Sequence, residues 1–364
     1  MNKKGIYICD IDETNQASGV TKKVYGQVMG FKKNGYNISI FNISRFRKGT
    51  SWHNKIISRF PFFASHYNWS YISIPYPFNF IYIRKPFLDV HFMLFLRRIK
   101  QHNRHAKLFL EIPTYPYIYE VRRFFDFPYL LKDLFWTYSL KHYIDYTVVY
   151  SDLYKRIYGI PCIGIKNGVD LDNIALKKNH HQDDRINLIG VANLNSWHGY
   201  DRIIRGIAKY GSQKTPQVHF YIVGDGPAKN DLMNLTDKLN LNNNVHFCGP
   251  LSGSALDDLF NIADMAVGSI GIYRIGLKYA SPLKEKEYCA RGIPFITTYN
   301  KLYEGCEFVV FEENCDTDVD ISNIVNIFKS KIRYIQSSTI REFALKKFAW
   351  EIQIEKIIQV GSIV

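Results

Sequence analysis

The chain contains 364 residues with a mass of 42.5 kDa, which exceeds one ordinary hydrophobic core and predicts two domains. Apolar residues make up 46% and charged residues 22%, a balance that excludes bulk disorder. No apolar run approaches the roughly 18–20 residues that a membrane-spanning helix needs. Because the 6 cysteines form no C-x-x-C pair and the first residues lack a signal-peptide pattern, we expect a cytoplasmic protein with free thiols.

Basic charge is concentrated in the first half. Residues 1–170 contain 25 Lys and Arg against 11 Asp and Glu, whereas residues 171–364 contain 22 of each, so the whole formal excess of +14 lies in the first half. Such an excess is typical of a domain that meets lipid headgroups or nucleic acid, although scattered solubilising charge is the simpler interpretation. Ten of the 23 residues from Phe60 to Tyr82 are aromatic. Strand and core account for such residues too, but basic residues next to exposed aromatics are also typical of a membrane interface. The candidate membrane contacts are Arg97, Arg98, Lys100, Arg104, Lys107, Arg122, Arg123 and the aromatic residues around Trp69.

The predicted elements of the first half alternate between strands and helices. Helical patterns cover 24–33, 90–99 and 130–143. Strand, helix, strand is the opening unit of a doubly wound parallel sheet. Apolar runs predict buried strands at 5–9, 36–41, 80–83, 107–112 and 146–150.

A second alternating series follows the polar segment 173–184, which is the best candidate for a linker. Helices are predicted from 201, over 229–239 and 255–262, and from 283. The predicted fold class is therefore α/β with two parallel-sheet domains, and a ligand is expected at the carboxyl ends of their strands. The predicted strands of this series are 186–190, 218–223, 245–247, 265–267 and 295–296.

One helix of the second series carries residues typical of a nucleotide site. The segment 281–296 predicts a helix that begins after Pro282, has Lys284 and Glu287 near its start, and ends before a strand. A helix N-terminus beside a lysine can hold a phosphate, and a carboxylate one turn later can accept hydrogen bonds from a ribose. Glu285 and Glu287 could instead simply complement the helix dipole.

This segment resembles the donor-site helix of retaining GT-B glycosyltransferases of family four (glycosyltransferase group 1). Their pattern is E-x7-E-x-x-x-x-G-x-P, whose second acid, glycine and proline coincide with Glu287, Gly292 and Pro294. Tyr279 stands where the first acid is expected. The resemblance implies a GT-B fold, in which two Rossmann-like doubly wound parallel-sheet domains face each other across a cleft.

Shorter matches extend the resemblance over nearly the whole chain. Residues 223–227 look like the family's V-G-x-G-P turn, and 165–170 look like its N-G-V-D element between the domains. Residues 264–269 are similar to a strand end, 18–20 correspond to the glycine loop that faces the donor, and 347–351 resemble the closing helix. The implied donor-binding residues are Gly19, Asn193, Gly224, Asp225, Gly226, Tyr279, Leu283 and Glu287.

A second departure from the family concerns the diphosphate. The usual Arg-Leu-x-x-x-Lys-Gly element reads Asn-Leu-Asn-Ser-Trp-His-Gly here, so Asn193 and His198 replace both cations. Because a GT-B site normally has no metal to neutralise the leaving diphosphate, the resemblance implies that other groups supply the charge. The candidates are Lys284, the helix N-terminus, His198 as an imidazolium, and Arg274 in the preceding loop.

The acceptor side is assigned to residues 111–117, which look like the acceptor loop of capsule and surface-polysaccharide members. Glu111 is therefore a catalytic candidate beside Lys284, His198 and Arg274, and a proline-rich turn that packs its tyrosines is the structural alternative. Asp10-x-Asp12 spells the D-x-D metal motif of the other glycosyltransferase fold. Since it follows the first strand at the start of the chain, and the second half has a complete sugar-nucleotide domain of its own, no metal site is expected.

The resemblance implies a retaining, metal-independent transferase that moves a sugar from a nucleotide-diphosphate sugar to a glycan or lipid-linked glycan, in capsule, exopolysaccharide or O-antigen synthesis. It implies an acceptor domain at 1–170, a donor domain at 171–344, and a closing helix at 345–364 that crosses back. The expected protein is peripheral at the inner face of the cell membrane, with no cofactor besides its co-substrate. The alternatives are a catalytically weakened homologue that serves as a binding or scaffold subunit, and a nucleic-acid binder that uses the basic first half.

Overall fold

The computed structural model describes residues 3–14, 18–47, 60, 62–63, 66–74, 77–116, 127–178, 184–211, 214–280 and 282–361. Arg122, Arg123 and the middle of the expected linker lie outside these residues. The chain divides into two compact units: unit 1 comprises Met1–Gly168 and Phe348–Val364, and unit 2 comprises Val169–Lys347. The predicted boundaries fall after residues 170 and 344. None of the helices within the described residues combines the length and the hydropathy needed to cross a bilayer.

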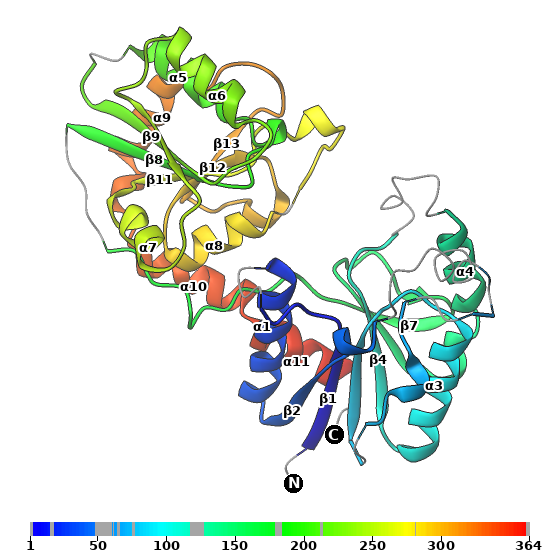
Figure 1. The fold of residues 1–364 in the computed structure, drawn as a ribbon. Helices are drawn as coiled ribbons and strands as arrows, with labels where there is room; N and C mark the ends of the chain where they lie inside the picture. The colour runs from blue at the N-terminus through cyan, green and yellow to red at the C-terminus, as the bar shows by residue number, and fades with distance from the viewer. Residues whose placement is uncertain are drawn as a thin grey trace. The chain divides into compact units, whose positions relative to one another are not determined.

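Unit 1 is built on a seven-stranded sheet in the order β2-β1-β3-β4-β5-β7-β6 (Figure 1). Its pairings are parallel except for the antiparallel pair of β6 and β7. The strands are β1 (Lys3–Cys9), β2 (Tyr36–Asn42), β3 (Phe80–Arg84), β4 (Lys107–Ile112), β5 (Tyr146–Val149), β6 (Arg156–Ile157) and β7 (Ile160–Gly164). The helices are α1 (Gly19–Lys33), α3 (Val90–His102), α4 (Phe127–Thr137) and α11 (Trp350–Val360), with short 3-10 turns η1 (Ser44–Phe46), η2 (Trp69–Tyr71) and η5 (Leu140–His142).

Successive side chains along a strand point to opposite faces of the sheet, so the strands of unit 1 contribute to two hydrophobic clusters, one on each face. Ile6 and Ile81 pack with α3, whereas Tyr7 and Tyr82 pack with α1 and α11. The last helix docks closely because a Cβ atom on Gly26 would lie 2.3 Å from the indole of Trp350. A glycine at this point of α1 therefore lets α11 complete the core of unit 1.

Unit 2 contains a six-stranded parallel sheet in the order β10-β9-β8-β11-β12-β13. The strands are β8 (Arg185–Val191), β9 (Gln217–Val223), β10 (Val245–Gly249), β11 (Met265–Val267), β12 (Phe295–Thr298) and β13 (Val309–Glu312). The helices are α5 (Tyr200–Tyr210), α6 (Lys229–Lys238), α7 (Gly253–Ile262), α8 (Leu283–Arg291), α9 (Ile321–Ser330) and α10 (Ser337–Phe348). The 3-10 turns are η6 (Ser196–His198), η7 (Ile272–Ile275), η8 (Lys301–Tyr303) and η9 (Ile332–Tyr334).

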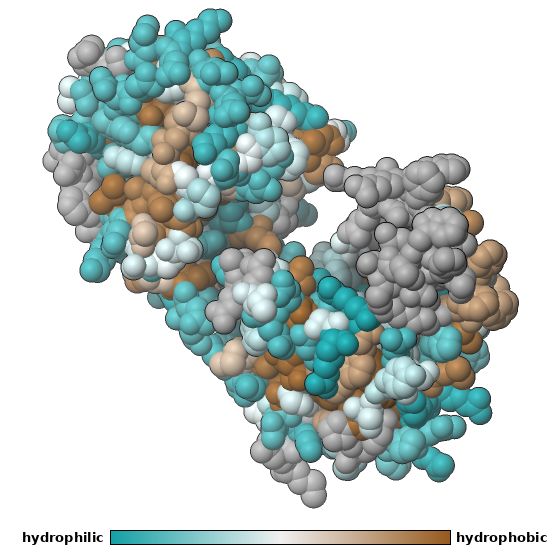
Figure 2. Space-filling view, in the orientation of Figure 1, coloured by the Kyte–Doolittle hydropathy of each residue, from teal (hydrophilic) through white to brown (hydrophobic). Residues whose placement is uncertain are grey.

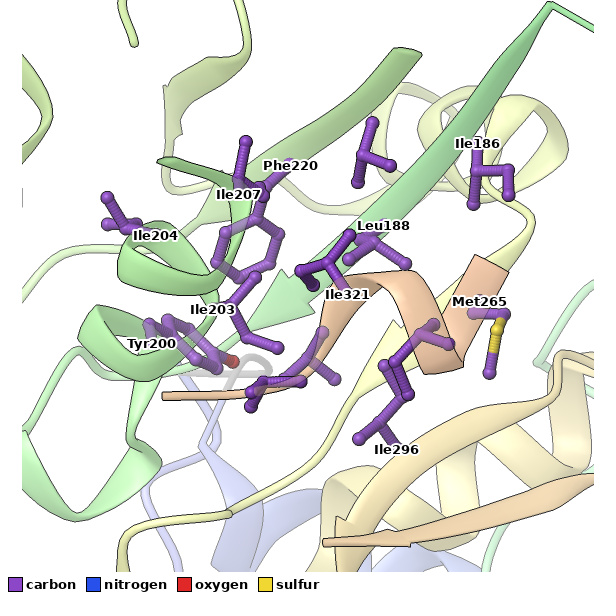
Figure 3. Packing of buried hydrophobic residues seen from close by; sticks show 14 of the residues in the cluster. Ile186, Leu188, Tyr200, Ile203, Ile204, Ile207, Phe220, Met265, Ile296 and Ile321 are labelled. Carbon is purple, nitrogen blue, oxygen red and sulfur yellow. The ribbon is translucent and has the colours of Figure 1, made fainter. Parts of the chain in front are cut away.

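The core of unit 2 lies between this sheet and the helices α5 and α9 (Figure 3). Ile203 and Ile207 of α5 contribute side chains one turn apart, and they join Leu188 of β8 and Phe220 of β9. Ile321 at the start of α9 belongs to the same cluster. The prediction of two doubly wound parallel sheets is confirmed, while β6, β7, β13, α9 and α10 were not predicted.

Candidate active site

Three loops and one helix start lie at the carboxyl edge of the second sheet. The loops follow β8, β9 and β11, and the helix is α8. Backbone hydrogen bonds connect these loops. The amide of Leu194 donates to the carbonyl of Asp225 at 2.8 Å, and the amide of Ile270 donates to the carbonyl of His198 at 3.1 Å. In an open parallel sheet this edge is where ligands bind.

Lys284 lies in the first turn of α8 with its amine turned toward the start of α5 and the loop after β11. Its Nζ lies 3.3 Å from the hydroxyl of Tyr200 and 3.4 Å from the carbonyl of Gly268. Burial lowers the pKa of Lys284 to about 7, although the neighbouring Glu285 opposes that shift. A bound anion would favour the ammonium form, so this lysine can gain a proton when it meets a diphosphate.

His198 lies close to Lys284 and is buried. Its Nδ1 accepts a hydrogen bond from the amide of Asn195 at 3.1 Å, so the neutral ring carries its proton on Nε2. Burial and the charge of Lys284 lower the pKa of His198 to about 3. Burial and Lys284 thus favour the neutral ring in the free protein, in which His198 offers a hydrogen-bond donor and no charge.

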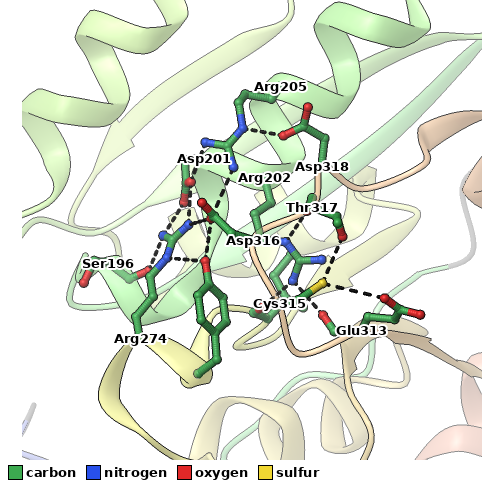
Figure 4. A network of polar contacts seen from close by, with 12 residues as sticks. Ser196, Asp201, Arg202, Arg205, Arg274, Glu313, Cys315, Asp316, Thr317 and Asp318 are labelled. Atoms are coloured by element: carbon green, nitrogen blue, oxygen red, sulfur yellow. Dashed lines mark hydrogen bonds and ion pairs between the residues drawn. The ribbon is translucent and has the colours of Figure 1, made fainter.

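Arg274 does not supply free positive charge either (Figure 4). Its guanidinium donates to both carboxylate oxygens of Asp201 at 2.7 and 2.8 Å, to Asp316 at 2.6 Å and to the carbonyl of Ser196 at 2.8 Å. The hydrogen bond to Asp201 is the main reason why the pKa of Arg274 is raised. Its contacts correct the expectation of a compensating cation: Arg274 braces the loop that carries His198.

Arg202 of α5 holds two other segments at this edge, the loop after β11 and the segment after β13, and no sequence motif pointed to it. The side chain is fully buried and donates to the carbonyls of Thr317 at 2.6 Å and Glu313 at 3.0 Å, and also to that of Ile270 (Figure 4). Its acceptors are backbone carbonyls, which any residue type provides, so no sequence pattern could reveal the contact.

The glycine turn after β9 packs against protein and leaves little backbone for a ligand. A Cβ atom on Gly224 would lie 1.8 Å from the carbonyl oxygen of Ala192, and one on Gly226 would lie 2.4 Å from that of Leu194. The amide of Gly224 donates to Gly249, and that of Gly226 donates to the carboxylate of Asp225. These glycines let two loops approach each other, and their part in donor binding stays a prediction.

The remaining predicted donor residues of unit 2 lie at or near the surface. Tyr279 and Leu283 are exposed at the approach to α8, and Asn193 is exposed in the loop after β8. Glu287 is half-buried one turn into α8, and one of its oxygens accepts a hydrogen bond from Nε of Arg291 at 3.0 Å. These side chains are therefore accessible to a ligand from solution.

Glu285 was noted in the sequence only for its position near the helix start, yet it lies buried behind Lys284. Its Oε1 accepts a hydrogen bond from the hydroxyl of Thr297 at 2.6 Å, whereas Oε2 is buried without a hydrogen-bond partner. Burial raises the pKa of Glu285 to about 7. Two groups that titrate near neutral pH thus occupy adjacent positions in the first turn of α8.

Glu111 is not an accessible catalytic group. It is fully buried in unit 1, where Oε2 accepts hydrogen bonds from Gln27 at 2.7 Å and from Tyr7 and Tyr82 at 3.0 Å each. Arg84 donates to Oε1 at 2.5 Å. The catalytic assignment is corrected: this carboxylate holds three strands and α1 together.

The donor-loop glycine and the D-x-D residues of unit 1 lie near the carboxyl ends of its strands. Gly19 begins α1, and a Cβ atom there would meet no other atom within 4 Å. Asp10 pairs with Arg47 at 2.6 Å and accepts from the hydroxyl of Tyr67, while Asp12 accepts from Thr14. Across the described ranges, no three His, Cys, Asp or Glu side chains come together as metal ligands would.

Comparisons with known proteins agree with this description. Residues 172–305, all within unit 2, match the family model "Glycosyl transferases group 1". A glycosyltransferase from Rickettsia africae matches with a TM-score of 0.59 at 13% identity, covering 99% of this chain and 98% of that one. The lipopolysaccharide outer core galactosyltransferase WaaB matches with a TM-score of 0.53 at 12% identity, covering 98% and 99%.

TarM from S. aureus, in a complex that contains UDP, matches with a TM-score of 0.51 at 15% identity, over 78% of this chain and 55% of TarM. A search of curated proteins finds no match. The chain has the GT-B fold of glycosyltransferases. Its second unit carries the match to group 1.

Proposed function

We propose that this protein is a retaining, metal-independent glycosyltransferase that uses a nucleotide-diphosphate sugar. The observation that carries the proposal is the half-buried Lys284 at the start of α8, with the buried His198 beside it, inside the segment that matches group 1. The relatives in fold support a sugar-nucleotide donor, since TarM is described with UDP and WaaB as a galactosyltransferase.

The chemistry needs a stabilised leaving group. The bond between the anomeric carbon and the phosphate oxygen breaks, the acceptor hydroxyl oxygen bonds to that carbon on the same face, and its proton passes to the diphosphate. Negative charge therefore develops on the diphosphate, and preorganised donors lower the barrier most when they face that charge. In this proposal, Lys284 as ammonium, the first amides of α8 and the Nε2–H of His198 donate to the diphosphate.

Glu287→Ala is expected to weaken donor binding by more than about tenfold, because each hydrogen bond from a ribose hydroxyl to a carboxylate contributes roughly 1.5–3 kcal/mol. Folding should change little, since the lost contact to Arg291 is a partly exposed pair within one helix. Titration calorimetry with nucleoside diphosphates measures the affinity. Unchanged affinity in Glu287→Ala, with Glu313→Ala as an exposed-acid control in unit 2, would remove Glu287 from the donor site.

Activity is expected to survive excess EDTA, because Lys284 provides a cation where a metal would otherwise be needed. Candidate nucleotide sugars are first screened by thermal stabilisation, where a ligand at 100 times its Kd adds about 2.7 kcal/mol. Turnover of the stabilising donors is then followed with and without chelator. Complete loss on chelation that manganese or magnesium restores would contradict the metal-independent mechanism.

The departures at Tyr279, Asn193 and His198 favour a second candidate, a weakened homologue that binds the donor without transferring it. Asn193 and His198 are neutral, and Arg274 is paired with Asp201 and Asp316. Donor binding without turnover on any acceptor would identify that role.

The acceptor in this proposal is a glycan of the capsule, exopolysaccharide or O-antigen type, carried on a lipid at the inner face of the cell membrane. The excess charge of +14 in residues 1–170 supports attraction of that half to anionic lipid. No cofactor besides the nucleotide sugar takes part.

A further inference from the structure

Helix α4 buries charged side chains and exposes apolar ones. Its charged residues Lys132 and Asp133 are 2% and 0% exposed, whereas Leu131 and Phe135 are 54% and 57% exposed. Leu134 is exposed as well. A surface helix of a globular protein normally presents the opposite pattern.

Internal contacts hold the helix in this orientation. Asp133 accepts from the amine of Lys85 at 2.7 and 2.8 Å and from the amide of Leu88 at 2.7 Å. The amine of Lys132 donates to the carbonyl of Phe63 at 2.6 Å. Turning the apolar side inward would separate Asp133 from Lys85 and leave the mostly buried amine of Lys85 without this partner, which is destabilising.

Aromatic residues beside α4 enlarge the apolar surface. Phe62 is 65% exposed, and its ring centroid lies 6.3 Å from that of Phe135 and 6.1 Å from that of Trp136. Tyr138 and Phe63 are also exposed. Figure 2 shows brown and tan surface where Figure 1 draws α4. We call this surface, formed by Phe62, Phe63, Leu131, Leu134, Phe135 and Tyr138, the α4 patch.

Charge decides between the partners that an apolar patch could bind. The patch itself contains no ionised residue, and the amine of Lys141 lies 3.9 Å from the ring centroid of Tyr138 at its margin. Phenylalanine and leucine flanked by lysine are typical of helices that lie in a membrane interface. A second copy of this chain would bring two strongly basic halves together, whereas an anionic bilayer complements them.

We propose that the α4 patch inserts into the interface of an anionic bilayer, an inference that rests on the proposed function and names its membrane contact. The lysine and amide that hold Asp133 follow the carboxyl end of β3. Insertion therefore turns the carboxyl edge of the first sheet toward the lipid. This places the contact away from Trp69, which is buried, and from Arg98 and Lys100, which bond within the protein.

The test is sedimentation of the full chain with phosphatidylcholine vesicles, with and without phosphatidylglycerol, over a range of salt. Apolar insertion is not screened by salt, so part of the binding to anionic vesicles should persist at high salt. In the triple variant Leu131→Gln, Leu134→Gln, Phe135→Ser, the affinity of this salt-resistant binding should fall by about tenfold or more. Met233→Gln, an exposed apolar site in unit 2, should bind like the wild type, and Arg97→Gln with Arg104→Gln should reduce only the salt-sensitive part.

Salt-resistant binding that survives in the triple variant would overturn the inference, and so would a wild-type protein that binds neither kind of vesicle. A dimer in sedimentation equilibrium that the triple variant converts to monomer would also overturn it, in favour of a second copy. Binding of nucleoside diphosphates by the same preparations tests the proposed function separately, and circular dichroism verifies that the variant is folded.

Discussion

Glu111→Gln is expected to destabilise unit 1 by about 3–5 kcal/mol, because removing one partner leaves a buried charge uncompensated. The carboxylate is fully buried and meets Arg84 at 2.5 Å and Lys23 at 4.0 Å. Gln27, Tyr7 and Tyr82 donate to its Oε2, and an amide nitrogen at that position would face donors.

The pH dependence of this contribution follows from the pKa of Glu111. Burial alone would raise that pKa, but Lys23, Arg84 and the hydrogen bonds hold it below its ordinary value. The carboxylate therefore stabilises unit 1 fully above pH 4.5 and loses its effect as the pH falls below that range. Glu111→Gln should show little of this acid dependence.

Hydrogen exchange resolved by segment is the appropriate measurement, since a chain of two units need not unfold in one step. Strands β1, β3 and β4 should lose protection in Glu111→Gln, while those of unit 2 keep it. Glu355→Gln, an exposed acid on α11 in the same unit, should stay within about 0.5 kcal/mol of the wild type. Equal protection in both variants would show that the Glu111 cluster adds no stability.

Lys284→Met is expected to weaken binding of a nucleotide-diphosphate sugar by roughly 10- to 150-fold, the equivalent of one hydrogen bond to a charged group. The ammonium is the cation at the start of α8, where the helix amides also favour an anion. Removing the amine should leave unit 2 folded, because its two contacts in the protein, at 3.3 and 3.4 Å, are long.

The same lysine predicts how binding depends on pH. Its pKa in the free protein is about 7, so above this pH the amine is neutral and must take up a proton when the diphosphate binds. Affinity should therefore fall by up to about tenfold per pH unit between pH 7 and 9. Glu285 becomes ionised in the same range, and its charge supports the ammonium and moderates the slope.

Calorimetry in buffers of different ionisation enthalpy measures this proton uptake directly. Lys284→Arg stays charged at every pH used, so it should bind the donor without proton uptake and with a flat pH profile. If the wild type takes up no proton above pH 7, Lys284 does not contact the diphosphate.

The amino-acid sequence determined the layers of this protein. Apolar runs such as 80–83, 107–112 and 265–267 became buried strands because a parallel sheet covered on both faces needs side chains that are apolar all along. The start of α8 could be predicted in the same way, since Pro282 followed by Glu285 and Glu287 is a local signal for the beginning of a helix. Local patterns of this kind depend on residues within one or two turns.

The tertiary structure decided what the charged residues do. Arg274 meets Asp201 across 73 positions of sequence, and Tyr7 meets Glu111 across 104, so neither pairing can be read from neighbouring residues. His198 is neutral because of burial and a lysine 86 positions later. Lys132 and Asp133 look like the solvent side of a helix, yet partners elsewhere in unit 1 bury them and leave Leu131 and Phe135 exposed. Desolvation and pairing set these states, and both depend on which distant segments the fold brings together.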